Sequence, residues 1–276
     1  FAAMKFYKYH GAGNDFLIAD GRGKTLNISP EYISAVCDRH TGFGADGVMV
    51  LEDSQDHDFR MRYFNSDGSG GMMCGNGGRC IVAFAADLGY KHFDFEAPDG
   101  LHVATVESAE SFAPTARIVS LKMKDVAGAV RHEDGWFLDT GTRHFVKFVS
   151  ELASCDVFHE GRRLRQDPRF APAGTNVNFV QVNAAGDISV RTYEKGVEDE
   201  TLACGTGIVA SAMASWLAEK EKTGDTPVNY KVHAKVADLA VSFIPLDKGI
   251  DPDYFRASEV WLTGPAAFVG TVETGF

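Results

Sequence analysis

The chain has 276 residues, enough for one large domain or two of ordinary size, and 45% of them are hydrophobic, as in globular proteins with a real core. Acidic and basic residues are interleaved around a net charge of −11, without the basic stripe that binds nucleic acid or anionic lipid. No apolar run approaches the roughly 20 residues that span a bilayer. These features exclude disordered and fibrous classes and make nucleic acid and membranes unexpected partners.

The cysteines and the first residues predict a reduced, cytoplasmic protein. Five cysteines are scattered without a CxxC pair, which argues against a disulfide framework and a zinc site, so we expect no metal. The segment FAAMKFYKYHGAGND turns polar soon after Met4, unlike a signal peptide. Cys37, Cys80 and Cys155 lack a glycine-rich helix start and are expected to be structural.

The first part of the chain predicts strands around two helices. Ser29 can cap the first helix, Pro30 suits its first position, and Gly42 is expected to end it after about His40. The second helix opens directly after Cys74. Strands are expected at 4–10, 15–19, 47–52, 58–65, 93–96, 101–107 and 116–123.

The order of elements recurs from about residue 124. A long helix follows Cys204, and other structure must surround it because it is apolar on nearly every side. The segments HEGRRLRQDPRFAPAG (159–174) and KGVEDETLA (195–203) are interpreted as a polar stretch and a loop. Strands are expected at 136–139, 144–149, 176–183 and 187–194.

Two pairs of segments indicate an internal duplication. NDFLIAD (14–20) parallels NVNFVQV (176–182), and RYFNSDGSGGMMCGNG (62–77) parallels RTYEKGVEDETLACGTG (191–207). We therefore expect an α+β fold of two pseudo-symmetric halves, each a curved, mainly antiparallel sheet wrapped around a central helix. The active site is expected in the cleft between the halves.

Each half places a cysteine directly before a glycine-rich helix start. The amide groups and the dipole at a helix N-terminus stabilise an anion, so a thiol there becomes a competent base or nucleophile. Neighbouring glycines let a substrate carboxylate approach the same amides. One cysteine before a glycine is usually a small buried residue, but Cys74 and Cys204 form a matched pair.

Two matched thiols suit the inversion of a stereocentre. A nucleophile needs one activated group, whereas inversion needs one group to remove a proton and another to deliver a proton to the opposite face. A thiolate and a thiol can do this in either direction. Helix-start amides that hold the substrate carboxylate would stabilise the charge that develops on it.

Six motifs are similar to those of one known family. They are HGAGNDF (10–16), FNSDGS (64–69), CGNGGRC (74–80), NVNF (176–179), YEKGVEDET (193–201) and ACGTG (203–207). Together, and in order up to GPAAFVG (264–270), they resemble diaminopimelate epimerase. The resemblance implies a pyridoxal-phosphate-independent, two-base enzyme without a cofactor, which interconverts LL- and meso-diaminopimelate for lysine and peptidoglycan synthesis.

The resemblance also implies a domain division, an assembly and a set of site residues. The N-terminal half would be 4–122 with 265–276 returning to it, the C-terminal half 123–264, and the assembly a homodimer. Cys74 and Cys204 match the two bases. His144 matches a histidine that helps to ionise the first cysteine. The implied substrate-binding residues are Asn14, Asn65, Gly75, Asn76, Asn176, Glu194, Lys195, Gly205 and Thr206. Glu194 would bind the substrate's amino group and is also counted among the catalytic residues.

Two positions depart from the family pattern. Lys195 stands where the family usually has arginine, and lysine lacks the planar fork that pairs with a carboxylate. Thr142 replaces the asparagine of a common GNPH motif, and Arg143 beside it is a candidate to compensate. Both departures concern recognition of the distal end of the substrate and leave the two thiols unchanged.

Alternatives remain for the residues and for the function. Asn65 and Asn14 can serve as turn residues, and His144 can be an ordinary strand histidine. The chain can also be a racemase that acts on proline or hydroxyproline, which shares the two-thiol chemistry. A third reading is a redox-responsive binding protein whose two thiols close to a disulfide.

Overall fold

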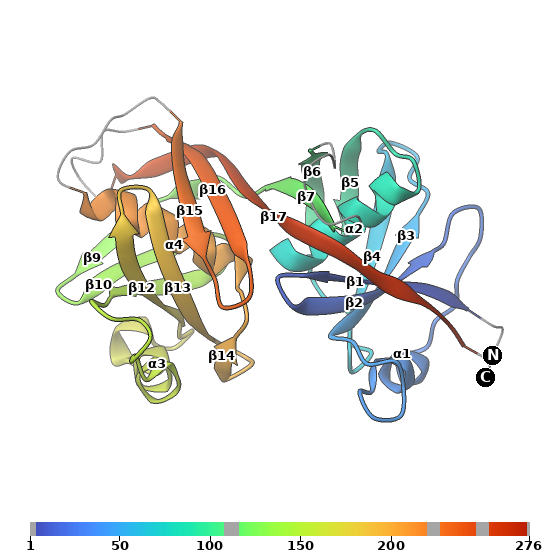
Figure 1. The fold of residues 1–276 in the computed structure, drawn as a ribbon, viewed down its shortest axis with the longest axis horizontal. Coiled ribbons are helices and arrows are strands. Elements are labelled where there is room, and N and C mark those ends of the chain that lie inside the picture. The colour runs from blue at the N-terminus through green and yellow to red at the C-terminus, as the bar shows by residue number, and fades with distance from the viewer. Residues whose placement is uncertain (1–3, 108–115, 220–226, 247–253, 275–276) are drawn as a thin grey trace. The chain divides into compact units, whose positions relative to one another are not determined.

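The computed structural model describes residues 4–107, 116–219, 227–246 and 254–274 (Figure 1). It divides into two compact units, Phe1–Leu121 with Gly264–Phe276 (unit 1) and Lys122–Thr263 (unit 2). Both units combine strands with helices, so the predicted α+β class is confirmed.

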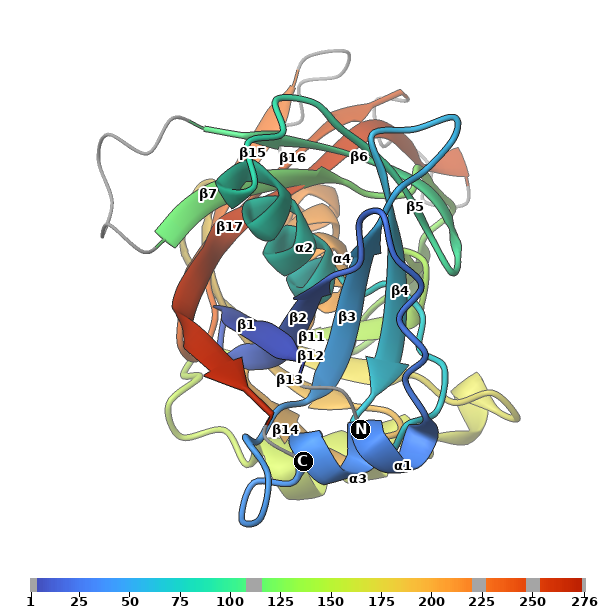
Figure 2. The ribbon, with the colours of Figure 1, turned by 90° about the vertical axis from the view of Figure 1, so that its right-hand side faces the viewer.

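Unit 1 is a curved sheet with one helix inside it. Neighbouring strands pair antiparallel, except for β2 with β3 and β4 with β5, which are parallel. The C-terminal part of β17 pairs with both β7 and β1 and so closes the sheet. Figure 2 shows α2 inside this sheet and α1 outside it. The elements are β1 (Lys5–Gly11), β2 (Asn14–Asp20), α1 (Pro30–Cys37), β3 (Gly47–Glu52), β4 (Phe59–Asn65), α2 (Gly75–Asp87), β5 (Phe93–Ala97), β6 (Gly100–Val106), β7 (Ala116–Lys122) and β17 (Arg256–Glu273).

Unit 2 repeats this arrangement around α4 (Figure 1). Its sheet runs from β10 through β11, β12, β13, β15 and β16 to the N-terminal part of β17, with β11–β12 and β13–β15 parallel. The elements are β8 (Val126–Ala127), β9 (Val130–His132), β10 (Gly135–Asp139), β11 (Arg143–Phe148), α3 (Val157–Arg165), a 3-10 turn (Pro168–Phe170), β12 (Asn176–Ala184), β13 (Asp187–Glu194), β14 (Asp199–Thr201), α4 (Gly205–Ala218), β15 (Val228–His233) and β16 (Asp238–Pro245).

The two units share one order of pairings, which corrects part of the predicted duplication. The match of β4 and α2 with β13 and α4 is right. The match of 14–20 with 176–182 is wrong, because β12 pairs parallel with the strand before it and antiparallel with β13, as β3 does with β2 and β4. The counterpart of β2 is β11. The inner strands share a pattern of apolar residues and asparagine. For this reason β2 was matched with β12, one strand and one helix too late in the chain.

The two central helices form the cores of their units. In α2 the residues from Gly75 to Ala85 are all buried. In α4 the described side chains are buried from Gly207 to Leu217, and Trp216 packs edge-on against Phe243. A helix that is enclosed by strands must be apolar around its whole circumference, which explains the alanine-rich sequences after both cysteines.

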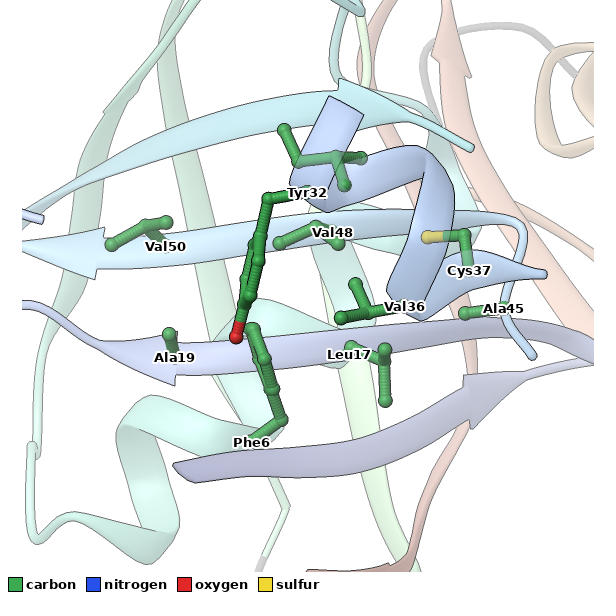
Figure 3. Close-up of a cluster of buried hydrophobic side chains, with 10 residues drawn as sticks. Phe6, Leu17, Ala19, Tyr32, Val36, Cys37, Ala45, Val48 and Val50 are labelled. Carbon is green, nitrogen blue, oxygen red and sulfur yellow. The ribbon is translucent and has the colours of Figure 1, made fainter. Parts of the chain in front are cut away.

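Two helices cover the outer faces of the sheets. Figure 3 shows Tyr32 and Val36 of α1 packed on Leu17 and Val48 of the sheet. Helix α3 covers β12 and β13 in the same way, through Val157 and Leu164 among others. The segment 159–174 was expected to be only a polar stretch. It contains most of α3, because Val157, Gly161 and Leu164 recur at helical spacing and face the sheet while arginines face solvent.

Other element predictions need smaller corrections. Helix α1 ends at Cys37 and not near His40, because the Asp38 carboxylate accepts bonds from the amides of His40 and Thr41 and closes a turn there. The expected loop 195–203 contains the short strand β14, which pairs with β13. The strands β8, β9, β15, β16 and β17 were not predicted.

Three cysteines lie away from both central helix starts. Cys37 is part of the apolar cluster in Figure 3, and burial raises the pKa of its thiol to about 11. Cys80 is fully buried in α2, and burial strongly raises its pKa. Burial also raises the pKa of Cys155, which is half-buried beside the cluster under α3. These environments keep all three thiols protonated near neutral pH.

Candidate active site

Cys74 caps the N-terminus of α2 with its sulfur. Its backbone is extended, and its Sγ accepts a hydrogen bond of 3.3 Å from the amide of Gly77. The carbonyl oxygen of Cys74 accepts from the amide of Gly78 at 2.8 Å, which begins the helical ladder. The sulfur therefore sits where the helix dipole and the first-turn amides both favour negative charge. The side chain is half-buried.

Two of the predicted asparagines lie beside this sulfur. Oδ1 of Asn14 is 3.9 Å from Cys74 Sγ and 3.5 Å from Nδ2 of Asn76, and Asn76 is buried in the first turn of α2 with Gly75. Nδ2 of Asn14 donates to the carboxylate of Asp46. This fixes the orientation of the Asn14 amide with its oxygen toward the helix start.

Asn65 lies at the end of β4 and bonds within its own turn. Its Nδ2 is 3.0 Å from Ser69 Oγ, and its backbone amide donates to the carbonyl of Ser69. These contacts fit the alternative in which Asn65 serves as a turn residue.

Cys204 precedes α4 as Cys74 precedes α2. Its Sγ lies 3.5 Å from the hydroxyl of Thr206, which also lies 2.9 Å from Nε2 of His144 and 2.9 Å from the hydroxyl of Thr142. Thr142, at the departure from the family pattern, therefore belongs to this polar cluster. Arg143 beside it places its guanidinium over the ring of Phe137.

His144 is fully buried and neutral. Burial lowers its pKa to about 3. Nδ2 of Asn178 lies 3.0 Å from His144 Nδ1 and 3.4 Å from the carbonyl oxygen of Phe145, which can only accept. Because the amide donates to Nδ1, the proton of the neutral ring is on Nε2, which faces the hydroxyls of Thr142 and Thr206. His144 is thus placed in unit 2 as a donor toward the hydroxyls of Thr142 and Thr206, and its expected role at Cys74 stays a prediction.

The remaining predicted residues lie at the adjacent ends of β12 and β13. Asn176 donates to the carbonyl of Arg143 at 2.9 Å, and its oxygen accepts from the amide of Lys195 at 2.8 Å. Glu194 precedes Lys195, and burial raises the pKa of its carboxyl. A raised pKa in a buried carboxyl is typical of groups that meet a ligand.

Helix α4 packs so closely against Asn178 and His144 at Gly207 that a larger side chain there is expected to be destabilising. A Cβ added at Gly207 would lie 2.4 Å from Asn178 Oδ1 and 3.1 Å from His144 Cε1, whereas one at the matching Gly77 would make ordinary contacts of 3.4 Å or more. We expect Gly207→Ala to lower the free energy of unfolding by about 1–3 kcal/mol, as overpacking does. Gly77→Ala is the matched control and should cost less than about 0.5 kcal/mol. Urea denaturation of both variants checks this, and equal losses would contradict the close approach.

The described part of the chain contains neither a metal-binding cluster nor a membrane-spanning helix. Within the described ranges, no cluster of three histidine, cysteine or acidic side chains has an arrangement that would bind a metal ion. None of the helices in the described part of the chain has the length and the apolar character that a bilayer crossing needs.

Two polar residues of this region were missed. Asn178 lies two residues after Asn176 on the same face of β12, so the period of a strand was the available signal. Arg79 is in the CGNGGRC motif and is fully buried, but an arginine in a glycine-rich motif gives no sign of burial.

Comparison with known proteins identifies the class of protein. A sequence model of the family described as "Diaminopimelate epimerase" matches residues 6–117 and 136–241. Two solved structures resemble the fold over 99–100% of the chain at only 14–15% identity. They are a phenazine biosynthesis protein of the PhzF family from Bacillus anthracis (TM-score 0.66, all of that chain) and a probable proline racemase from Agrobacterium radiobacter (TM-score 0.65, 93% of that chain). The fold is therefore the two-unit fold of these proteins.

Curated relatives narrow this class to one family. A protein of Flavobacterium psychrophilum named "Diaminopimelate epimerase" is 42% identical, over 96% of this chain and 98% of its own length. One of the same name from Chlorobaculum tepidum is 40% identical, over 95% and 98%. The chain belongs to the diaminopimelate epimerase family, and the predicted resemblance is confirmed.

Proposed function

We propose that this protein epimerises diaminopimelate, interconverting the LL and meso forms. The observation that carries the proposal is the pair of half-buried thiols, each directly before the first turn of the central helix of its unit. Family membership and relatives that carry this enzyme's name support the choice of substrate. Lysine and peptidoglycan synthesis are the pathways this activity would serve.

The proposed reaction is a proton transfer between two thiols through one α-carbon. A thiolate takes the α-proton and becomes a thiol, while the electron pair of the broken C–H bond moves toward the substrate carboxylate. The other thiol gives its proton to the opposite face and becomes a thiolate. Amides of Gly75, Asn76, Gly205 and Thr206 are proposed to bind the carboxylate, which stabilises the developing charge. No step needs a cofactor.

The other residues are proposed to bind and to orient. Asn14, Asn65, Asn176 and Lys195 would bind the distal amino-acid group of the substrate. Glu194 is proposed to bind the substrate's amino group, which its burial favours because an unsolvated carboxyl gains from a cationic partner. His144 is proposed to fix the Thr206 hydroxyl, in addition to its predicted role at Cys74.

The setting and the assembly are proposals as well. We propose that the protein works in the cytoplasm, because five thiols suit a reducing compartment, and that it forms a homodimer. Light scattering during size-exclusion chromatography should give twice the mass of the chain. A single-chain mass at micromolar concentration would contradict the dimer.

Thermal stabilisation separates the proposed substrate from the proline-type alternative. A ligand that binds only the folded state raises the unfolding midpoint. We expect LL-diaminopimelate, in the presence of reductant, to raise the midpoint in proportion to the logarithm of its concentration, and proline and hydroxyproline to leave it unchanged. Stabilisation by proline alone would replace diaminopimelate by a proline derivative. If none of these ligands stabilised the protein, the redox-responsive reading would gain.

A further inference from the structure

An arginine is completely buried beneath the helix start that follows Cys74. Arg79 has no exposed surface, and its side chain turns back toward the N-terminus of its own helix. There Nη1 donates to the carbonyl of Gly75 at 3.2 Å and Nη2 donates to Oδ1 of Asn76 at 2.8 Å. The Nε group is buried without a hydrogen-bond partner.

The charge of this arginine is not paired with a carboxylate in the described part of the chain. Within the described ranges no acidic side chain forms an ion pair with Arg79. A buried charge carries a large desolvation cost unless an opposite charge is close. The positive end of the α2 dipole has the same sign as Arg79 and adds to this cost. The position therefore calls for an anion.

Nearby carboxylates already have partners of their own. Asp15 forms ion pairs with Lys8 and Arg39, which hold its pKa at about 2 despite the opposing effect of burial, and Asp46 binds Arg39 and Asn14. Two further groups near α2 are also paired: Asp87 binds Tyr9 and Arg117 at the far end of the helix, and His102 of β6 binds Asp99.

Among the groups described around the Cys74 sulfur, Tyr63, Cys80 and Arg79 interact with it electrostatically. Burial strongly raises the pKa of Tyr63 and of Cys80, so both are neutral. Arg79 is the third, and although burial lowers its pKa, negative charge at Cys74 would raise it again. The sulfur of Cys74 is thus the group that a buried guanidinium can stabilise as an anion.

The matching position of the second helix differs. Arg79 is five residues after Cys74, and five residues after Cys204 stands Val209, which is buried and apolar. Polar groups described near Cys204 include the hydroxyl of Thr206 and, beyond it, the neutral imidazole of His144. Hydrogen bonds from neutral groups stabilise an anion less than a buried cation does. The two central helices are alike in fold and differ in charge at this matched position.

We propose that Arg79 is a positioning residue that makes Cys74 the thiolate of the resting protein, while Cys204 rests as the thiol. The catalytic consequence of this charge state rests on the proposed function. In the first turnover, Cys74 is the base that accepts the α-proton and Cys204 is the acid that delivers one. The ionisation itself does not depend on the substrate. Arg79 also donates a hydrogen bond to Asn76 Oδ1. It therefore orients the first turn of α2 in addition to placing positive charge beside it.

Competitive alkylation of the intact, reduced protein without substrate tests the proposal. The protein is treated with limiting iodoacetamide from pH 5.5 to 9.5, and peptide mass spectrometry gives the rate at Cys74 and at Cys204 separately. The midpoint of each pH profile reports ionisation, whereas different accessibility changes only the plateau. We expect the Cys74 midpoint to lie at least about one pH unit below the Cys204 midpoint. At pH values below both midpoints, the thiolate fraction of Cys74 is then about ten times that of Cys204.

Two variants assign the effect to the charge of Arg79. Arg79→Gln keeps an amide donor without the charge and should raise the Cys74 midpoint by about one unit or more, leaving the Cys204 midpoint as an internal control. Arg79→Lys should retain most of the low midpoint. A Cys74 midpoint equal to or above that of Cys204 overturns the proposal, as does an unchanged Cys74 midpoint in a folded Arg79→Gln protein. The comparison of the two midpoints in the intact protein needs no substitution and no substrate. The proposal therefore stays testable if a variant misfolds or if the substrate is not diaminopimelate.

Discussion

Replacing either Cys74 or Cys204 with alanine is expected to lower the epimerisation rate by about 100- to 10,000-fold, the usual contribution of one acid or base. The physical reason is that each direction of the reaction needs one group that accepts the α-proton and another that delivers one. Both thiols stand before the first turn of a central helix, where a thiolate is stabilised. The rate of meso-diaminopimelate formation from the LL form measures the loss.

Cys155→Ala is the control for this prediction. Cys155 is also half-buried, but burial raises its pKa, and it packs beside the cluster under α3. Its removal should leave the rate within about twofold. A rate for Cys204→Ala near that of the intact protein would show that a single base suffices and would remove the two-thiol mechanism.

Acid is expected to destabilise the protein through His144 alone by about 1.4 kcal/mol for each pH unit between about pH 6 and 3.5. Burial holds the folded-state pKa of His144 at about 3, below the value near 6.5 of an exposed histidine. Between these values unfolding takes up one proton, so the free energy of unfolding falls as pH falls. This contribution is complete above pH 6.5.

A comparison of slopes isolates His144 from the carboxylates that also titrate in acid. Urea denaturation of the intact protein and of His144→Gln is measured from pH 7 to 3.5, and the variant should lose stability less steeply by about one bound proton. His233→Gln is the control of opposite sign, because the hydrogen bond to Asp238 raises the pKa of His233. The stability that His233 contributes is present in acid and is lost as pH rises through its folded pKa. Parallel curves for the intact protein and His144→Gln would contradict a neutral buried imidazole.

Local sequence was sufficient for the elements whose patterns are strong. Helix α2 and strand β13 begin where Cys74 and Asp187 predict, because a glycine-rich start followed by an apolar run, and a strict alternation of residues, leave few alternatives. Strands β15 to β17 were missed. β15 and β16 pair locally with each other, whereas β17 also pairs with β1 and β7, which are distant in sequence. The duplication was recognised, but its register needed the order of strand pairing.

The candidate site shows the same division between local and distant information. A cysteine before Gly-x-Gly predicts its own place at a helix start, and both helices do start there. The neutral state and tautomer of His144 depend on Asn178, which is 34 residues away in the chain. Burial of Arg79 depends on the closure of a whole sheet around α2. Charge states set by tertiary enclosure cannot be predicted from a motif.

Exchange of the substrate α-proton tests the central claim most directly. The reduced protein is incubated with LL-diaminopimelate in D₂O, and NMR and chiral analysis follow deuterium at the α-carbon and the appearance of the meso form. The two-thiol account predicts that deuterium enters as meso product forms, and that both are lost in Cys74→Ala and in Cys204→Ala. An intact, reduced protein that leaves the α-proton in place would contradict it.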